Sequence, residues 1–110
     1  SELTPEAHDE MIAFTSQLAH VVSNAYVKTP TAQNHKGFSA GSYKDMTRVA
    51  WLNENMWTEL FLANKEPLLG ELDRIINSLQ QYRDAIADDD AQTLCSLLRD
   101  GRIAKEQSEG

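Results

Sequence analysis

The spacing of the apolar residues between positions 68 and 86 is the feature that most constrains the fold. They recur every three or four residues, which is the period of an amphipathic α-helix and differs from the strict alternation of a strand. The members of this apolar stripe are Leu68, Leu72, Ile75, Ile76, Leu79, Tyr82 and Ile86. A helix with such a stripe must bury it against other helices or against a second chain.

A second long helix is predicted over about residues 5–27. Thr4 is a hydroxyl N-cap, and Pro5 suits the first helical position, where a missing N–H costs nothing. The helix should stop at residues 28–30, and residues 31–39 show no periodicity and should form a loop. The apolar residues at helical spacing in this helix are Ala7, Met11, Phe14, Leu18, Val21, Val22 and Ala25.

Capping residues predict two short helices in the middle of the chain. Ser42 followed three residues later by Asp45 resembles a capping box and predicts a helix over about residues 42–52. Asn53 is expected to cap a short third helix, which carries Met56, Trp57, Leu60 and Phe61.

Similar signals bound the last two helices. Asn64 is expected to cap the long helix with the stripe, and residues 88–90, three aspartates, should end that helix and cap a fifth. The fifth helix weakens at Gly101 and should fray from about Lys105. Because no strand candidate is found, the chain is predicted to be all-α, a single helical bundle domain of about five helices. The stripe exceeds what the other helices cover, so the bundle is expected to interlock in a homodimer.

Charge and composition exclude several classes of protein. Seventeen acidic and ten basic residues give the 110-residue chain a net charge of −7, which repels phosphate backbones, so no nucleic-acid partner is expected. The single cysteine, Cys95, excludes an internal disulfide and a cysteine zinc cluster, and it is expected to be a buried, inert thiol. No apolar run approaches the ~18 residues of a membrane span, and no signal segment opens the sequence, so the default expectation is a cytoplasmic protein without membrane contact.

The five glycines form neither a dinucleotide-binding nor a P-loop fingerprint. The chain is therefore not expected to bind a nucleotide cofactor or to be a complete cofactor-dependent enzyme. No metal site is expected either, because His8 and His20 lie about 18 Å apart along one helix and no His/Glu pair has the spacing of zinc ligands.

His20 adjoins Val21 and Val22 on the apolar half of the first helix. Two interpretations of it are open. It is either a histidine at the edge of the core, satisfied by a backbone carbonyl, or a donor to a ligand oxygen.

Two cations, Lys44 and Arg48, lie four residues apart on the second helix, with Asp45 between them. The planar guanidinium of an arginine can bind a carboxylate through two hydrogen bonds, which would make an anion site. The same face could instead be solvated and held by an Asp45–Arg48 pair. Trp51 and Trp57 flank this element and could be core residues or the wall of a pocket for a small ring.

Four segments, taken in order, follow the pattern of one family. Residues 4–9, TPEAHD, are similar to its T-P-E-x-H-D opening, and residues 16–20, SQLAH, to its S-H-L-P-H. Residues 41–50, GSYKDMTRVA, resemble its F-x-D-x-T-R-h-A, where h is apolar. Residues 55–66, NMWTELFLANKE, resemble its W-x-D-h-F-L-x-N-K. These are motifs of the helical C-terminal domain of prephenate dehydrogenases, and the resemblance covers nearly the whole chain.

The resemblance implies that residues 1–110 are a dimerising, substrate-binding domain. The NAD-binding N-terminal domain, which holds the family's catalytic histidine, is absent. These enzymes oxidatively decarboxylate prephenate to 4-hydroxyphenylpyruvate with NAD, on the way to tyrosine. The sequence leaves open NADP as cofactor and the aminated analogue arogenate as substrate.

The resemblance also implies roles for single residues. Arg48 matches the substrate-binding arginine, and His20 matches the second histidine of S-H-L-P-H. Trp57 matches a tryptophan expected to reach the site of the partner subunit, and Lys44 and Asp45 fall in the ionic network around the arginine. Prephenate is a dianion with a small ring, so it needs a bidentate cation, a hydroxyl partner and an apolar wall, which Arg48, His20 and Trp57 could supply. No catalytic or cofactor-binding residue is expected in this chain.

The sequence departs from the family pattern at three positions. Gln17 stands where a histidine is frequent, Ala19 replaces a proline, and Glu59 replaces an aspartate. Two other functions remain open. The chain could be a non-catalytic helical module that senses an aromatic amino acid or binds a partner helix, or a structural bundle whose Arg48 and His20 are incidental.

Overall fold

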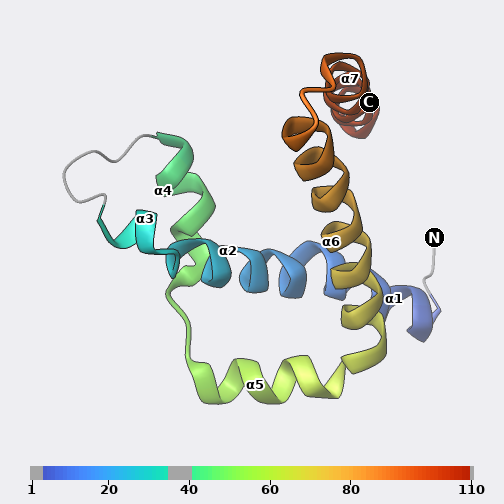
Figure 1. The fold of residues 1–110 in the computed structure, drawn as a ribbon. Coiled ribbons are helices and arrows are strands. Elements are labelled where there is room, and N and C mark those ends of the chain that lie inside the picture. The colour runs from blue at the N-terminus through green and yellow to red at the C-terminus, as the bar shows by residue number, and fades with distance from the viewer. Residues whose placement is uncertain (1–3, 35–40, 110) are drawn as a thin grey trace. The chain divides into compact units, whose positions relative to one another are not determined.

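The computed structural model describes residues 4–34 and 41–109 of the chain. All regular elements in these two ranges are helical (Figure 1), which confirms the predicted all-α class. Contacts divide the chain into two compact units, Ser1–Leu72 and Asp73–Gly110. Within the described ranges, no helix combines the length and the apolarity needed to cross a membrane.

The predicted helix over residues 5–27 is present as one continuous run. It opens with α1 (Pro5–Ile12), where the Thr4 hydroxyl accepts a hydrogen bond from the Ala7 N–H at 3.0 Å, so the predicted cap is confirmed. The run closes with α2 (Ala19–Val27).

A π-helical segment, η1 (Ala13–Leu18), joins α1 to α2. This segment could not be predicted from the sequence, because neither glycine nor proline interrupts the helical pattern there. A π turn holds one extra residue and so changes the face on which the following residues lie. Phe14 is 60% exposed although it belongs to the apolar pattern, whereas the buried residues of the segment are Ala13, Gln17 and Leu18.

The loop predicted for residues 31–39 is wrong in its first part. The chain forms one helical turn, α3 (Pro30–Gln33), which begins at a hydrogen bond of 3.3 Å from the Ala32 N–H to the Thr29 hydroxyl. Thr29 and Pro30 thus repeat the start of α1, where a hydroxyl cap is followed by a proline. These two residues end the helical run 5–27 and begin α3. Residues 35–39 of the predicted loop lie outside the described residues.

The helix predicted over residues 42–52 is shorter and begins earlier. It consists of α4 (Gly41–Thr47) and a 3₁₀ turn, η2 (Arg48–Ala50). Because α4 already includes Gly41, Ser42 lies inside the first turn and does not precede it, so the predicted capping box is wrong. The tighter 3₁₀ turn places Arg48 at the end of the α-helix rather than within it.

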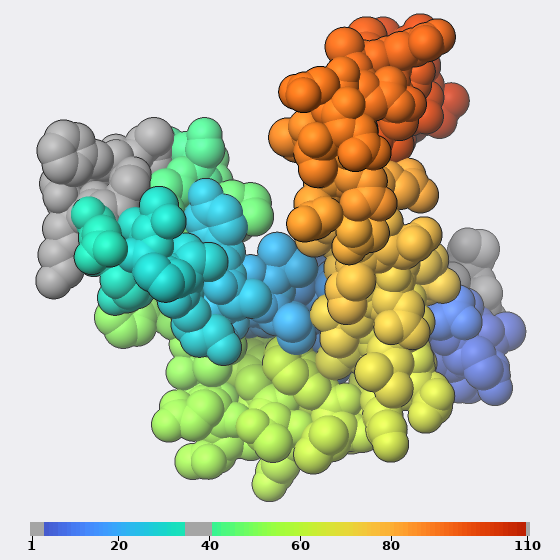
Figure 2. Space-filling view, in the orientation of Figure 1, coloured from blue at the N-terminus to red at the C-terminus, as the bar shows by residue number. Residues whose placement is uncertain are grey.

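The third helix follows its prediction. It is α5 (Glu54–Ala63), and the Asn53 side chain accepts a hydrogen bond from the Met56 N–H at 3.0 Å. α5 runs beside the helical run 5–27 in the opposite direction (Figure 1). The space between the two ribbons is filled by side chains, as the space-filling view shows (Figure 2).

Asn64 holds the N-cap position of the next helix, but among the described residues no N–H of that helix bonds to its side-chain oxygen, so the predicted side-chain cap is wrong. Its side-chain amide nitrogen donates to the backbone oxygen of Asp9 at 3.0 Å and to Gln17 Oε1 at 2.8 Å. Only the backbone oxygen of Asn64 serves the helix, by accepting from the Leu68 N–H at 3.1 Å. The helix itself, α6 (Lys65–Ala87), spans the predicted stripe and contributes to both units.

The second unit contains the rest of α6 and α7 (Ala91–Glu109). The aspartate break is confirmed, because Asp90 Oδ1 accepts from the Thr93 N–H at 3.1 Å and caps α7. Asp89 has φ 53°, in the left-handed region where an aspartate is among the better tolerated residues. This backbone turn separates the two helices.

The predicted weakening of α7 at Gly101 and fraying from Lys105 are wrong. Ion pairs four residues apart join Arg102 to Glu106 at 2.6 Å and Lys105 to Glu109 at 2.8 Å, and such pairs support the last turns of an exposed helix. Cys95 is exposed on α7, so its predicted burial is also wrong.

The hydrogen bonds at Asp90 predict how the stability of the folded chain depends on pH in the acid range. The Thr93 hydroxyl first, and then the Thr93 backbone N–H, hold the pKa of Asp90 below its ordinary value. The lower pKa belongs to the folded state, so the contribution of the charged cap is complete above the unfolded pKa of about 4. It is lost as the pH falls through the folded pKa.

Asp90→Asn caps the helix without titrating. Urea denaturation followed by circular dichroism should therefore show that the variant loses less stability than the parent between about pH 5 and about pH 2. Equal losses in the two proteins would contradict the assigned role of Asp90.

Candidate functional site

A groove of about 490 Å³ lies between the helical run 5–27 and the segment α4–η2. The two walls are also joined by the rings of Tyr26 and Tyr43, whose centroids are 6.1 Å apart. The groove is lined mostly by apolar side chains, and its charged or titratable members are His20, Asp45 and Arg48. Three of the five residues predicted to bind substrate therefore line a single groove.

His20 is half-buried, and its Nδ1 lies 2.8 Å from the backbone oxygen of Ser16. Because a carbonyl oxygen can only accept, Nδ1 must carry the proton of this bond. The other ring nitrogen, Nε2, then accepts hydrogen bonds when the ring is neutral and donates when the ring is protonated. His20 thus makes the backbone hydrogen bond expected of a histidine at the edge of the core. This bond uses Nδ1 and leaves Nε2 available to a ligand.

Arg48 and Asp45 are exposed at the other wall of the groove. In the part of the chain that the structure describes, no ion pair joins them, so the Asp45–Arg48 pair of the alternative interpretation is absent. Lys44 is exposed on α4 and does not line this groove. The guanidinium of Arg48 is therefore not neutralised by an acid of its own helix.

Trp57 does not line this groove. The two rings stack with centroids 4.0 Å apart and planes 24° apart, and Phe61 tilts against Trp57 at 5.5 Å. His20 and Trp57 together line a second hollow of about 290 Å³ between α2 and α5, which also includes Lys28 and Glu54. Trp57 thus acts within its own chain as the backing of the His20 ring.

Trp51 is neither in the core nor in the wall of the groove. It is 92% exposed, directly after η2, beside a small hollow lined by Val27, Tyr43, Thr47 and Ala50. It is not a core residue, and it does not line the groove of His20 and Arg48.

Residues 4–100 match the family described as "Prephenate dehydrogenase, dimerization domain". The chain belongs to this family. A cyclohexadienyl dehydrogenase from Zymomonas mobilis is 32% identical over 109 residues, which cover 94% of this chain and 37% of that protein. A prephenate dehydrogenase from Bacillus subtilis is 31% identical over 114 residues, which cover 99% of this chain and 30% of that protein. The chain thus spans about a third of the length of these relatives.

Solved structures agree with this assignment. The crystal structure of prephenate dehydrogenase from A. aeolicus in complex with hydroxyphenyl propionate and NAD+ superposes with a TM-score of 0.81 at 28% identity, over 97% of this chain and 39% of that one. Synechocystis arogenate dehydrogenase superposes with a TM-score of 0.83 at 22% identity, over 96% of this chain and 41% of that one, which shows the shared fold.

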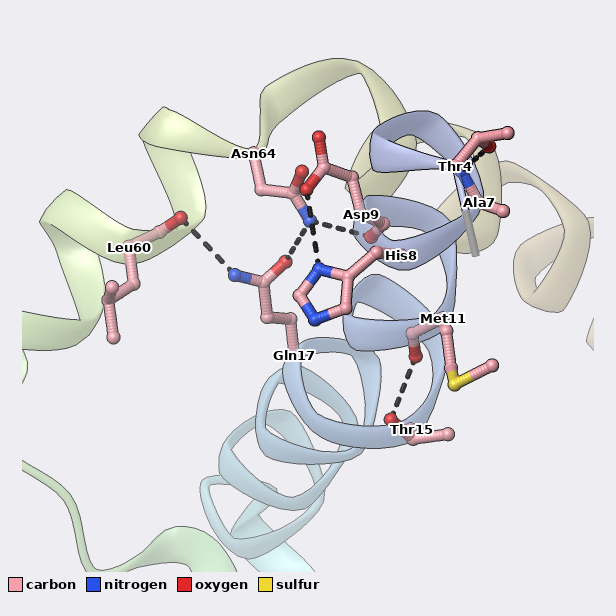
Figure 3. Close-up of polar contacts among 9 residues, drawn as sticks. All are labelled: Thr4, Ala7, His8, Asp9, Met11, Thr15, Gln17, Leu60 and Asn64. Carbon is pink, nitrogen blue, oxygen red and sulfur yellow. Dashed lines mark hydrogen bonds and ion pairs between the residues drawn. The ribbon is translucent and has the colours of Figure 1, made fainter. Parts of the chain in front are cut away.

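The side-chain amides of Gln17 and Asn64 bond to each other and to the backbone of neighbouring helices (Figure 3). Gln17 is only 4% exposed, and its Nε2 donates to the backbone oxygen of Leu60 at 3.2 Å. Its Oε1 accepts from the side chain of Asn64, which also donates to the Asp9 backbone oxygen. The helical run 5–27 is thereby tied to the end of α5.

Sequence reasoning missed both partners of this amide pair. Asn64 stands one residue before a helix, where asparagine is a common cap, and Gln17 stands at a departure from a family pattern. One signal was available, because Gln17 falls between Ala13 and Val21 on a face that is otherwise apolar. A polar residue on a buried face needs hydrogen-bond partners from elsewhere in the fold.

Ser23 is the other buried polar residue that sequence reasoning missed. It is 2% exposed and lines the groove, and its hydroxyl has no hydrogen-bond partner among the described residues. Its small size suits the close approach of α2 to η2. Within residues 4–34 and 41–109 no group of three or more His, Cys, Asp or Glu side chains could hold a metal ion.

Proposed function

We propose that this chain is the dimerising, substrate-binding domain of an NAD-dependent prephenate dehydrogenase, an enzyme of tyrosine biosynthesis. The observation that carries the proposal is the groove in which His20 and Arg48 face one space from two different elements. The solved relative from A. aeolicus binds hydroxyphenyl propionate, a ring with a carboxylate, and this supports a ligand of the same chemistry here.

The groove offers three kinds of contact to prephenate. The guanidinium of Arg48 can bind one carboxylate through two parallel hydrogen bonds. His20 Nε2 can accept from the ring hydroxyl when neutral or donate to a carboxylate when protonated. The apolar side chains of Phe14, Val22 and Val49 line the same groove and can contact the ring.

The chemical step needs parts that these residues do not supply. The reaction releases CO₂ from prephenate and transfers a hydride to NAD, which gives 4-hydroxyphenylpyruvate and NADH. The glycines of this chain form no dinucleotide-binding fingerprint. In the proposed function the rest of the protein therefore binds NAD and supplies the catalytic histidine, whereas this domain binds and orients the substrate.

The purified 110-residue chain should therefore produce no NADH from prephenate. The absorbance of NADH at saturating prephenate and NAD measures this directly. The same protein extended by an NAD-binding domain is the positive control. Turnover by the 110-residue chain alone would contradict the proposal that the rest of the protein supplies NAD binding and catalysis.

Arg48→Lys should not be conservative in the full enzyme. Lysine keeps the charge and loses one of the two parallel donors, and a charged hydrogen bond contributes about 1.5–3 kcal/mol. The KM for prephenate should rise by about ten- to a hundredfold, while the KM for NAD stays near its parent value.

Arg102→Lys is the matched control for this substitution. Arg102 is exposed on α7 and pairs with Glu106, so a lysine there keeps the ion pair and should leave both KM values unchanged. If Arg48→Lys changes the KM for prephenate by less than about twofold, Arg48 is only a solvated surface residue.

The family description supports a homodimer. Part of the apolar stripe of α6 has no cover within its unit, since Ile76, Leu79 and Ile86 are 59%, 58% and 60% exposed. These three side chains fall on one face of the helix. A two-fold interface buries the same face of both copies, and an obligate one exceeds about 2,000 Å².

The double substitution Leu79→Glu with Ile86→Glu should convert the dimer to a monomer, because it places two charges of each copy in an apolar interface. Sedimentation equilibrium at micromolar concentration measures the mass. Asn77→Glu is the control, since Asn77 is exposed on the other side of the same helix and its variant should remain dimeric. A parent protein that is itself monomeric would contradict the proposal.

A further inference from the structure

We propose that Gln17 is a positioning residue, which sets the position of the His20 ring by fixing α5 and its Trp57 against the helical run 5–27. The role of His20 toward a ligand rests on the proposed function, whereas the positioning itself does not. The resemblance of the sequence to its family assigns nothing to Gln17.

The first support is the way in which the Gln17 amide is bound. It is 4% exposed, and both ends of the amide are engaged, Nε2 by Leu60 at 3.2 Å and Oε1 by Asn64 at 2.8 Å. An amide bonded at both ends cannot rotate without breaking one of the bonds, and a buried polar group without partners is costly. The side chain therefore has one defined orientation.

The second support is that Leu60 offers an oxygen which its own helix leaves unused. In a regular α-helix the N–H of Asn64 would bond to this oxygen. Here the Asn64 N–H bonds to the Phe61 oxygen at 3.1 Å, so the Leu60 carbonyl is one of the unsatisfied groups of a helix end. Gln17 satisfies it from another part of the chain.

The third support is the register of the two helical segments. Gln17 and His20 are three residues apart on one segment, and Leu60 and Trp57 are three residues apart on the other. The amide contact and the ring stack are therefore successive contacts of the same antiparallel pair, about 4.5 Å apart along the axis. A shift of α5 at Leu60 must carry Trp57 with it and so alter the stack on His20.

The experiment follows the stack without any substrate. The chain has two tryptophans, and Trp51 is 92% exposed, so Trp51→Phe leaves Trp57 as the single emitter. A protonated imidazole in contact with an indole quenches its fluorescence. The emission of the Trp51→Phe protein should therefore fall on acidification, as His20 gains its proton. The other charged groups beside these rings are Lys28, Glu54, Asp45 and Arg48.

Gln17→Met on this background keeps the side-chain length and removes both hydrogen bonds. One net hydrogen bond changes an equilibrium about two- to tenfold, so the stacked population, and with it the amplitude of the fluorescence transition, should fall. Quenching by acrylamide should increase in parallel as Trp57 loses its contact. Gln80→Met is the matched control, because the Gln80 side chain donates to Asp84 on the same helix, and it should leave the transition unchanged.

Two further variants make the outcome decisive. His20→Phe must abolish the transition, and a transition that survives it would show that Trp57 does not stack on His20, which overturns the proposal. Asn64→Ala leaves the bond of Gln17 to Leu60 and should reduce the amplitude less than Gln17→Met. It carries the test if Gln17→Met loses its helical circular dichroism.

A folded Gln17→Met protein with the parent amplitude and the parent acrylamide quenching would also overturn the proposal. This result would leave the proposed function standing, because that function is tested separately by the KM of Arg48→Lys. Conversely, an unchanged KM in Arg48→Lys would leave the positioning role of Gln17 intact.

Discussion

The packing of α5 against the helical run 5–27 depends on a polar contact in which the buried amide of Gln17 bonds to Leu60 and to the half-buried Asn64. Few apolar side chains are buried among the described residues of the first unit, and those that are buried are Ala13, Leu18 and Leu68. Hydrophobic contact has no direction, whereas a hydrogen bond specifies both a distance and an angle. The amides therefore supply the register that the small apolar core leaves undefined, and they do so at the point where α5 ends and α6 begins.

The alignment of α5 with the helical run 5–27 affects the groove through two contacts of His20. Trp57 is fixed on α5 and backs one face of the His20 ring, while the Ser16 carbonyl holds Nδ1 and so determines which ring nitrogen is free. Arg48 is placed independently, by the change from α-helix to 3₁₀ turn after Thr47. The histidine and the arginine are thus positioned by separate parts of the fold, so a disturbance of one does not by itself displace the other.

The sequence predicted those parts of the structure that have local causes. Thr4, Asn53 and Asp90 cap their helices as expected, because a cap requires only a side-chain oxygen and an N–H a few residues away. Asn64 differs, because its side-chain nitrogen donates to Asp9 and Gln17 and no N–H of α6 bonds to its side-chain oxygen in the described part of the chain. The partners of Gln17 could not be predicted, since Leu60 and Asn64 lie more than forty positions away in the chain. The π segment contains neither glycine nor proline, so no local signal indicates it. The joint placement of His20 and Arg48 came from family resemblance and not from spacing alone.

The charge of the groove depends on a single proton. Among the described residues that line it, Arg48 and Asp45 carry opposite charges, so the groove is neutral when His20 is neutral and carries one positive charge when His20 is protonated. The chain as a whole has a net charge of −7, and it repels an approaching dianion everywhere else on average. In the proposed function, a dianionic ligand is therefore attracted more strongly to the groove with a protonated His20 than to the groove with a neutral one. Because Nδ1 already carries the proton that it donates to the Ser16 carbonyl, a second proton binds at Nε2, the ring nitrogen left for a ligand in the proposed function.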